Sequence, residues 1–193
     1  MRLAVFCLVA TAVLPSLSRA QAPVFAITPK GSSIKFYVKA SVALKGSFDK
    51  WDATLKFTSP DLATGVLYIR IQAASVNTGS GTKDRKLKGK DFFDAKQHPL
   101  ITFLSKKTVQ TGPNTFDVHG DFTIRGVSKP ETLALTVSGA GTGSGAIKGT
   151  MAFDRKDYGM DSDIPFIKIA DRVEVTFDLK VKRVSGPPVV LKQ

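Results

Sequence analysis

The sequence predicts an all-β fold: an antiparallel barrel of about eight strands with one short helical segment. Three observations support this prediction. Apolar and polar residues alternate with period two in segment after segment, turn signals recur between these segments, and residues 83–95 form the one stretch after residue 30 that does not read as strand or turn. Consecutive strands with short links can remove their exposed edges by closing into a barrel.

Eight segments carry the strand pattern. They are residues 33–39, 51–57, 67–72, 101–110, 115–124, 132–137, 147–153 and 173–182. The last is the clearest: Val173, Val175, Phe177, Leu179 and Val181 occupy one face, and residues 174, 176, 178, 180 and 182 are polar or charged. Each such strand is expected to bury one face and to expose the other to water.

Hairpin turns are predicted between these strands. Their signals are Lys45-Gly46-Ser47, Ser59-Pro60-Asp61, Gly112-Pro113-Asn114, residues 125–130 and the glycine-rich run Gly139 to Gly145. Residues 185–193, which contain Pro187-Pro188, are expected to trail off the domain as a flexible tail. An eight-stranded barrel of this kind either fills its interior with side chains or holds one small ligand.

The first twenty residues read as a cleaved secretory signal peptide. Met1-Arg2 is a basic start, Leu3 to Leu14 is an apolar run, and Ser18-Arg19-Ala20 places small residues at the two positions that a signal peptidase reads. A retained anchor is the alternative, but the run is shorter than the about 20 residues that span a bilayer as a helix. Because the only cysteine, Cys7, lies in this leader, disulfides are not expected to hold the fold.

The chain is strongly basic, with 28 Lys and Arg residues against 16 Asp and Glu residues and a net charge of +12. Removal of Arg2 and Arg19 with the leader leaves 28 − 2 = 26 basic residues and a charge of +10. This balance favours anionic partners such as phospholipid or pyrophosphate head groups, whereas nucleic acid is not expected as a partner of an exported protein. The alternative is that the lysines are solvated strand faces, kept for solubility and edge protection.

The residues that could perform catalysis form no recognisable constellation. No Gly-x-Ser-x-Gly nucleophile turn occurs, and His98 and His119 stand too far apart in sequence for a common zinc-binding spacing, so we interpret both as turn residues at strand ends. Asp84, Asp91 and Asp94 could supply paired carboxylates for acid/base chemistry, but the surrounding basic residues favour their ionised forms. We expect a non-catalytic protein with no metal or cofactor; a lipid hydrolase or isomerase is the enzymatic alternative.

Three ordered motifs resemble those of the YceI-like family. The first combines Lys83-Asp84-Arg85-Lys86-Leu87, Asp91-Phe92-Phe93-Asp94-Ala95 and His98-Pro99-Leu100-Ile101-Thr102-Phe103. The second is residues 120–130 and the third is Phe153-Asp154-Arg155-Lys156-Asp157-Tyr158-Gly159-Met160. The resemblance covers about residues 24 to 183. One position departs from the family pattern, since Lys86 stands where members often carry histidine.

This resemblance implies a lipocalin-like eight-stranded up-and-down barrel over residues 21–184, with the helical segment capping or lining it. It also implies an apolar interior that binds a polyisoprenoid or similar lipid, such as a polyprenyl phosphate or a quinone. The leader and the family together indicate the bacterial periplasm, and the family makes a homodimer plausible. A filled barrel that docks its basic face to an acidic membrane or protein, as a structural or stress-response module, is the alternative.

The candidate ligand-binding residues follow from the inward faces of the predicted strands and from the helical segment. For the apolar cavity they are Phe36, Val38, Trp51, Leu55, Phe57, Ile69, Ile71, Phe92, Phe93, Phe103, Phe122 and Phe177. Asp84, Arg85 and Lys86 are the candidates for a head-group site at the barrel mouth, and Arg125 and Lys129 form a second candidate basic rim.

Overall fold

A computed structural model of the chain describes residues 22–41, 43–162 and 169–191. The predicted leader, with Cys7, lies outside the described residues. The strands are β1 (Val24–Ala40), β2 (Leu44–Phe48), β3 (Trp51–Lys56), β4 (Val66–Gln72), β5 (Val76–Asn77), β6 (Leu100–Gln110), β7 (Thr115–Ile124), β8 (Val127–Ser138), β9 (Ser144–Asp154) and β10 (Ile169–Ser185). One α-helix, α1 (Gly81–Lys88), and three short 3₁₀ turns, η1 (Leu62–Thr64), η2 (Ala73–Ser75) and η3 (Arg155–Tyr158), join them.

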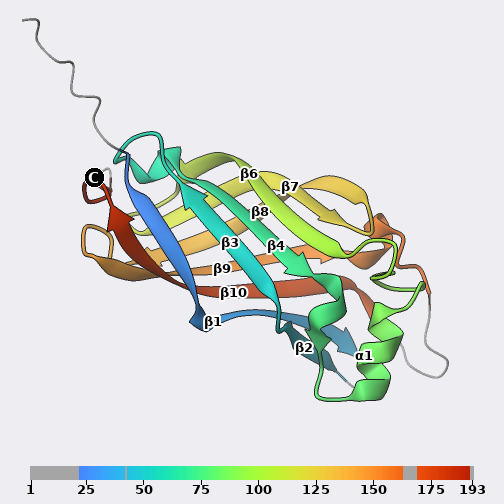
Figure 1. Cartoon of the computed structure of the whole chain (residues 1–193). Coiled ribbons are helices and arrows are strands. Elements are labelled where there is room, and N and C mark those ends of the chain that lie inside the picture. Colours follow the sequence, from blue (N-terminus) through green and yellow to red (C-terminus); the bar gives the residue numbers. More distant parts are fainter. Residues whose placement is uncertain (1–21, 42, 163–168, 192–193) are drawn as a thin grey trace, which may run out of the picture.

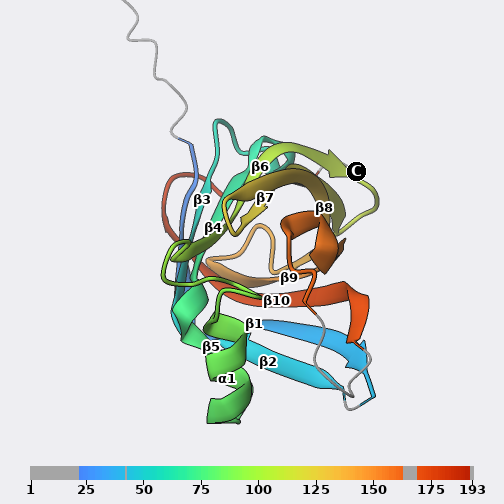
Figure 2. The ribbon, with the colours of Figure 1, turned by 90° about the vertical axis from the view of Figure 1, so that its right-hand side faces the viewer.

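Eight of the strands close into an antiparallel barrel (Figure 1). Their order is β10-β9-β8-β7-β6-β4-β3-β1, and β1 pairs with β10 to complete the ring. Figure 2, turned by 90°, shows α1 beside one end of this ring. The predicted fold class, an eight-stranded antiparallel barrel with one short helical segment, is therefore confirmed.

Strand β1 bends sharply halfway along its length (Figure 1). Its register against β10 shifts between Thr28 and Ser33, where Gly31 adopts a positive φ of 81° that favours glycine. Before the bend β1 also pairs with β3, and after it β1 pairs with β2 instead. The short strand β2 in turn pairs with β5. The bend thus separates β1 from β3 on one side of the barrel.

The barrel interior is built from the alternating faces that the sequence predicts. On β10, Val173, Val175, Phe177, Leu179 and Val181 are all buried. Midway along the barrel, Ile69, Phe103 and Leu133 are almost completely buried. Burial of such side chains stabilises the fold by about 1.5–3 kcal/mol each.

The predicted turn at Lys45-Gly46-Ser47 is wrong, because these residues lie within β2. Gly46 is needed there for a close approach: a Cβ at this position would stand 2.7 Å from the Phe36 ring and 2.8 Å from the Asn77 carbonyl oxygen. Gly46, which suggested a turn, instead leaves space for the Phe36 ring to pack against β2.

The turn predicted over residues 125–130 is also shorter than expected. Only Arg125 and Gly126 form it, both with positive φ, and β8 begins at Val127. His119, which we interpreted as a turn residue, lies within β7, where its Nδ1 is 2.9 Å from the Thr132 hydroxyl oxygen. Pairing between β7 and β8 determines both the length of this turn and the strand position of His119. Local turn signals in the sequence do not indicate such pairing.

The C-terminal segment lies against the barrel instead of trailing away from it. Val190 N–H donates to the Pro60 carbonyl at 2.8 Å, and Leu62 N–H donates to the Val190 carbonyl at 3.3 Å. Val189 is buried. The expectation that residues 185–193 leave the domain is therefore wrong through Leu191; the last two residues lie outside the described part.

Helix α1 starts and ends earlier than the predicted helical segment of residues 83–95. After Lys88 the chain continues in turns that are closed by backbone hydrogen bonds from Phe93 N–H to the Leu87 carbonyl at 2.9 Å and from Ala95 N–H to the Lys88 carbonyl at 3.1 Å. Leu87, Phe92 and Phe93 are buried by this arrangement. The aromatic pair therefore enters the barrel from a turn and not from the helix.

Candidate ligand-binding cavity

An internal cavity of about 60 Å³ occupies the end of the barrel beside α1. Residues from β1, β2, β4, β6, β7, β9, β10, η3 and the α1 segment line it, and the surface that they expose to it is apolar. They are Phe36, Val38, Leu44, Phe48, Ile71, Leu87, Phe92, Phe93, Ile101, Phe122, Ile124, Phe153, Arg155, Met160, Ile169, Val173, Val175 and Phe177. Such a cavity can hold a hydrocarbon chain but offers no polar partner for a head group.

Aromatic rings form much of this wall. The ring centroids of Phe36 and Phe48 lie 5.7 Å apart, and those of Phe48 and Phe93 lie 5.8 Å apart. Across the cavity, Phe122 and Phe153 are 5.0 Å apart. These are distances at which tilted aromatic pairs attract each other.

Tyr158 supports this second aromatic pair. Its ring meets Phe122 and Phe153 edge-on at 5.5 and 5.2 Å, and its hydroxyl donates to Glu131 Oε1 at 3.0 Å. Burial raises the pKa of the Glu131 carboxyl, and burial together with the nearby carboxylates raises the pKa of the Tyr158 hydroxyl. Because the Tyr158 phenol stays protonated, it can donate its hydrogen bond to Glu131 and hold its ring against Phe122 and Phe153.

Arg155 holds the cavity rim together from a buried position. Its Nη1 donates to the carbonyl oxygens of Met160 and Ser162, the second at 3.1 Å, and its Nη2 lies 3.0 Å from Asp171 Oδ1. Lys156 Nζ lies 2.9 Å from Asp171 Oδ2. The hydrogen bond from Lys156 lowers the pKa of Asp171, and the charge of Arg155 adds to this effect. Arg155 therefore faces the cavity with its carbon atoms while its guanidinium joins η3 to the start of β10.

The predicted wall residues divide among four places. Phe36, Val38, Ile71, Phe92, Phe93, Phe122 and Phe177 line the cavity beside α1. Leu55 and Phe57 line a second cavity, of about 40 Å³, farther along the barrel. Ile69 and Phe103 are packed in the layer between the two cavities and line neither. Trp51 lines a cleft on the outside of the barrel.

The predicted head-group residues do not line the cavity. Asp84 Oδ1 accepts hydrogen bonds from the backbone N–H and the hydroxyl of Thr78, at 2.8 and 2.7 Å, and the hydroxyl hydrogen bond is the main cause of its lowered pKa. Lys86 Nζ is 2.5 Å from Asp91 Oδ2 and 5.7 Å from the centre of the Phe92 ring. Arg85 is exposed. Asp84 thus anchors the helix, and a head-group role for the three stays a prediction.

The second candidate rim is engaged in internal contacts. Arg125 Nη1 donates to the Gly159 carbonyl oxygen, and Lys129 Nζ is 2.9 Å from Asp157 Oδ1. Lys129 thereby contacts η3, which carries Arg155, and Arg125 contacts the residue that follows η3. This arrangement favours a structural role for the rim.

Several wall residues were not among the candidates from the sequence, notably Phe48, Leu87 and Met160. Phe48 belongs to a strand whose alternation is hidden by Gly46. Leu87 is the one apolar residue of a charged helix, which is a weak signal. Phe153, Val173 and Val175 lie on predicted inward faces, so the period-two pattern alone could have found them.

Two further properties concern the part of the chain that the structure describes. In it, His, Cys, Asp and Glu side chains form no group of three or more that could hold a metal ion. Among the same residues, no helix is long and apolar enough to cross a bilayer.

Comparison with known proteins places these features in a family. Residues 25–181 match the YceI-like domain. A UPF0312 protein of Pseudomonas syringae pv. tomato is 29% identical over 140 residues, which cover 70% of this chain and 72% of the relative. The crystal structure of BcnA from Burkholderia cenocepacia superposes with a TM-score of 0.73 at 28% identity, covering 80% of this chain and 98% of that one.

A polyisoprenoid-binding domain from Saccharophagus degradans, implicated in plant cell wall breakdown, shares the fold with a TM-score of 0.65. The alignment covers 83% of this chain and 99% of that one, at 14% identity.

Proposed function

Because this chain belongs to the YceI-like domain family, we propose that it is a lipid-binding protein that encloses the apolar tail of an isoprenoid lipid in its barrel, without catalysis. The observation that carries this proposal is the cavity beside α1, whose exposed surface is wholly apolar. A related fold described as a polyisoprenoid-binding domain supports the choice of ligand class. The ligand's head group is proposed to be a phosphate or a quinone.

The gain from tail burial is large enough to bind such a ligand. Each CH₂ group removed from water contributes about 0.8 kcal/mol, so a five-carbon isoprene unit offers roughly 3–4 kcal/mol before the loss of chain freedom is subtracted. The cavity of about 60 Å³ has room for only a short length of chain. A longer tail therefore requires aromatic side chains of the wall to change rotamer as it enters.

The cellular part of the proposal rests on the sequence. A basic leader with an apolar run and small residues before position 21 supports export, and the family supports the periplasm as its destination. There the protein would carry or store its lipid, in transient contact with anionic membrane surfaces that its net charge favours. A homodimer is a further proposal that the family suggests.

Native mass spectrometry tests the binding proposal. The protein is produced in a bacterium with its leader intact, purified from the periplasm, and measured before and after organic extraction. The expected result is a reproducible apolar adduct of several hundred daltons that extraction removes and added farnesol replaces. A clean apo mass that does not change when farnesol or a longer prenol is added contradicts the proposal.

One observation favours a second candidate function. Ile69, Phe103 and Leu133 fill the barrel at mid-height and are nearly inaccessible, so much of the interior is an ordinary core. A protein that uses its barrel only as a scaffold for a basic surface would share this property. Such a module would bind vesicles of anionic phospholipid equally well before and after lipid extraction and would take up no prenol.

A further inference from the structure

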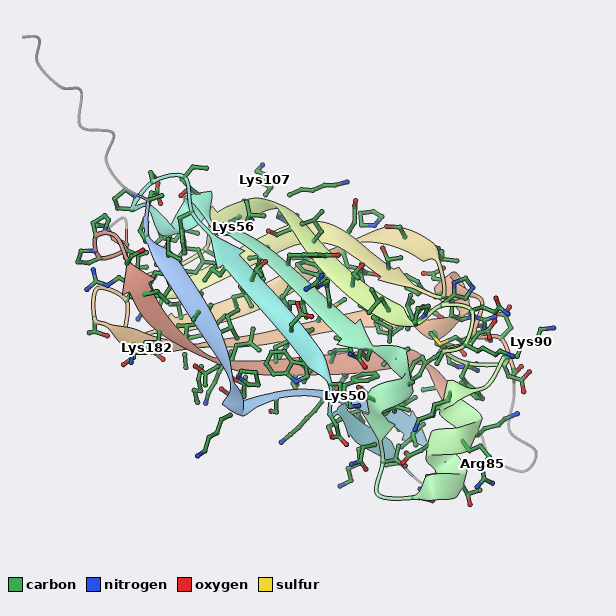
Figure 3. The ribbon with its side chains drawn as sticks, in the orientation of Figure 1. Lys50, Lys56, Arg85, Lys90, Lys107 and Lys182 are labelled. Atoms are coloured by element: carbon green, nitrogen blue, oxygen red, sulfur yellow. The ribbon has the colours of Figure 1, made fainter. Side chains whose placement is uncertain are left out.

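A cleft opens on the outer wall of the barrel where β1 turns away from β3. It measures about 560 Å³ and is lined by Pro29, Ser32, Ser33, Lys35, Ser47, Phe48, Asp49, Lys50, Trp51, Asp52 and Gln72. Figure 3 shows Lys50 where β3 begins, beside the part of β1 that follows the bend. This cleft lies on the side of the barrel and not at its α1 end.

The cleft exists because strand pairing is interrupted at this place. The pairing of β1 with β3 covers only Val24 with Lys56 and Phe25 with Leu55. Beyond the bend, β1 pairs with β2, from Lys35 to Val38. Two strand edges that would otherwise be hydrogen-bonded neighbours diverge, and the space between them reaches toward the barrel interior.

Phe48 separates the cleft from the internal cavity, because it lines both. It is 7% exposed, and its ring packs between those of Phe36 and Phe93. No other residue lines both spaces in the described part of the chain. Phe48 is therefore the candidate gate between the apolar cavity and the outer cleft.

The charges on the cleft favour an anion. Asp52 Oδ1 lies 2.7 Å from Arg70 Nη2, and Asp49 Oδ2 accepts a hydrogen bond from Asn77 Nδ2 at 2.9 Å. By contrast, Lys35 and Lys50 are exposed and, among the described residues, form no ion pair. Arg70 lies outside the lining and neutralises Asp52, so Lys35 and Lys50 stand against Asp49 as the one lining carboxylate that has no ion-pair partner among the described residues.

The cleft also offers neutral donors. The hydroxyls of Ser33 and Ser47 and the amide of Gln72 line it beside the lysines. Lysine ammonium groups together with hydroxyl donors suit a phosphate, whose oxygens accept several charge-assisted hydrogen bonds.

From this juxtaposition we infer that the cleft is a lateral head-group site for an isoprenoid phosphate or pyrophosphate, with Phe48 as the gate through which the tail enters the cavity. The inference rests on the proposed lipid-binding function and makes it more specific. Lys35 and Lys50 bind the phosphate, and Trp51 lies at the edge of the same site. The wholly apolar cavity leaves the head group outside the barrel, and the cleft is where it can find cations.

A pair of ligands and a charge-reversal variant test the head-group site. Binding of farnesyl phosphate and of farnesol is measured on the delipidated mature protein and on the double variant Lys35→Glu, Lys50→Glu. The variant should bind farnesyl phosphate about tenfold or more weakly, because two charge-assisted contacts become repulsive, and farnesol within about twofold of the wild type. Equal farnesyl phosphate affinity in the variant and the wild type overturns the inference.

Two control variants with the same change in net charge complete this test. Lys107→Glu with Lys182→Glu places the reversal away from the cleft (Figure 3), and it should leave both affinities nearly unchanged. An equal loss of farnesyl phosphate binding in this control would mean that only the overall charge matters and would overturn the inference. Arg85→Glu with Lys90→Glu reverses charges near α1, and a loss confined to this variant places the head group there instead.

These outcomes also distinguish this inference from the proposed function. If the wild type binds neither ligand, the lipid-binding function itself fails, and the cleft with it. If the wild type binds both ligands and the Lys35→Glu, Lys50→Glu variant binds farnesyl phosphate with the same affinity, only the lateral head-group site is wrong.

The gate has its own measurement, because Trp51 is the single tryptophan of the chain and lies on the cleft. Its fluorescence should change when farnesyl phosphate binds, and stopped-flow mixing then gives the association rate. Phe48→Leu should raise this rate severalfold, whereas Phe153→Leu, which alters the cavity wall beside Phe122 and away from the Phe48 ring, should not. An unchanged rate in Phe48→Leu, or an equal rise in both variants, contradicts the gate.

Discussion

Arg155 and Asp171 join the two chain segments that border the cavity beside α1: Arg155 Nη2 lies 3.0 Å from Asp171 Oδ1. The Arg155 side chain is only 4% exposed, whereas that of Asp171 is 37% exposed. Because the arginine also donates to the carbonyl oxygens of Met160 and Ser162, one buried cation organises η3, the following residues and the start of β10. This contact therefore links two of the segments that form the cavity rim.

The first prediction concerns removal of the Asp171 charge. Asp171→Asn should lower the free energy of unfolding by more than a surface control does, because a buried guanidinium loses its carboxylate. Asp178→Asn, on the same strand and with a similarly exposed side chain, removes only the surface contact with Lys180 and should cost about 0–1 kcal/mol. Urea unfolding of both variants measures the difference, and equal losses would contradict the role of Arg155.

The second prediction is the pH dependence of this contact. Since the folded pKa of Asp171 is lowered, the unfolded chain binds the proton more readily, and stability rises with pH over the interval between the two values. The contribution is complete above the unfolded pKa of about 3.9 and is lost as pH falls through the folded pKa. The gap in urea midpoint between wild type and Asp171→Asn should therefore be wider at about pH 7 than at about pH 2.5. A gap that stays constant argues against the lowered pKa.

The third prediction assigns Asp84 to the fold. Asp84→Ala leaves the N–H and the hydroxyl of Thr78 without their acceptor and should cost about 1–2 kcal/mol. Arg85→Gln changes an exposed neighbour and should cost less than about 0.5 kcal/mol. Thermal or urea unfolding measures both. If Asp84→Ala is as stable as the wild type but loses farnesyl phosphate binding, Asp84 is a ligand residue after all.

The fourth prediction compares the two cavities. Val175→Phe places a larger side chain in the cavity beside α1 and should reduce prenol uptake at least about tenfold, with a stability change below about 1.5 kcal/mol because space is present. Val137→Phe makes the same substitution in the second cavity and should leave uptake nearly unchanged. Titration with farnesol measures both variants. Loss of uptake in Val137→Phe alone would place the tail in the second cavity.

The fifth prediction concerns Phe103, a sequence-based wall candidate that lines neither cavity. Phe103→Ala should lower the free energy of unfolding by about 3–5 kcal/mol, as expected for truncation of a packed aromatic side chain. Prenol uptake per folded molecule should not fall. A stable variant without uptake would restore Phe103 to the binding site.

Much of the fold could be predicted from the sequence because strand alternation is a local property. Val173 to Val181 of β10 and Leu67 to Ile71 of β4 are buried as their period-two pattern indicates. Local turn signals were less reliable. The turn predicted at Lys45-Gly46-Ser47 is absent because Gly46 makes room for the ring of Phe36 from another strand. The residues next to Gly46 in the sequence give no sign of this contact.

The candidate site was only partly predictable for the same reason. Inward direction alone cannot tell whether a side chain borders a cavity, as Ile71 does, or fills the layer between two cavities, as Ile69 does. Phe48 escaped prediction because its strand is short and interrupted by Gly46. Arg155 lay in a recognised motif, yet its contact with Asp171 joins residues that the sequence does not relate.

The sequence by itself determined that this chain is a closed antiparallel barrel with an apolar inside and a basic outside. Alternation and composition are local properties that can be read from each strand segment. Only the tertiary structure decided where that barrel is hollow and where it opens. The bend of β1 at Thr28–Ser33, the ring of Phe48 and the buried Arg155 act through contacts between segments distant in sequence. Cavities are what packing leaves unfilled, and packing depends on all the strands together.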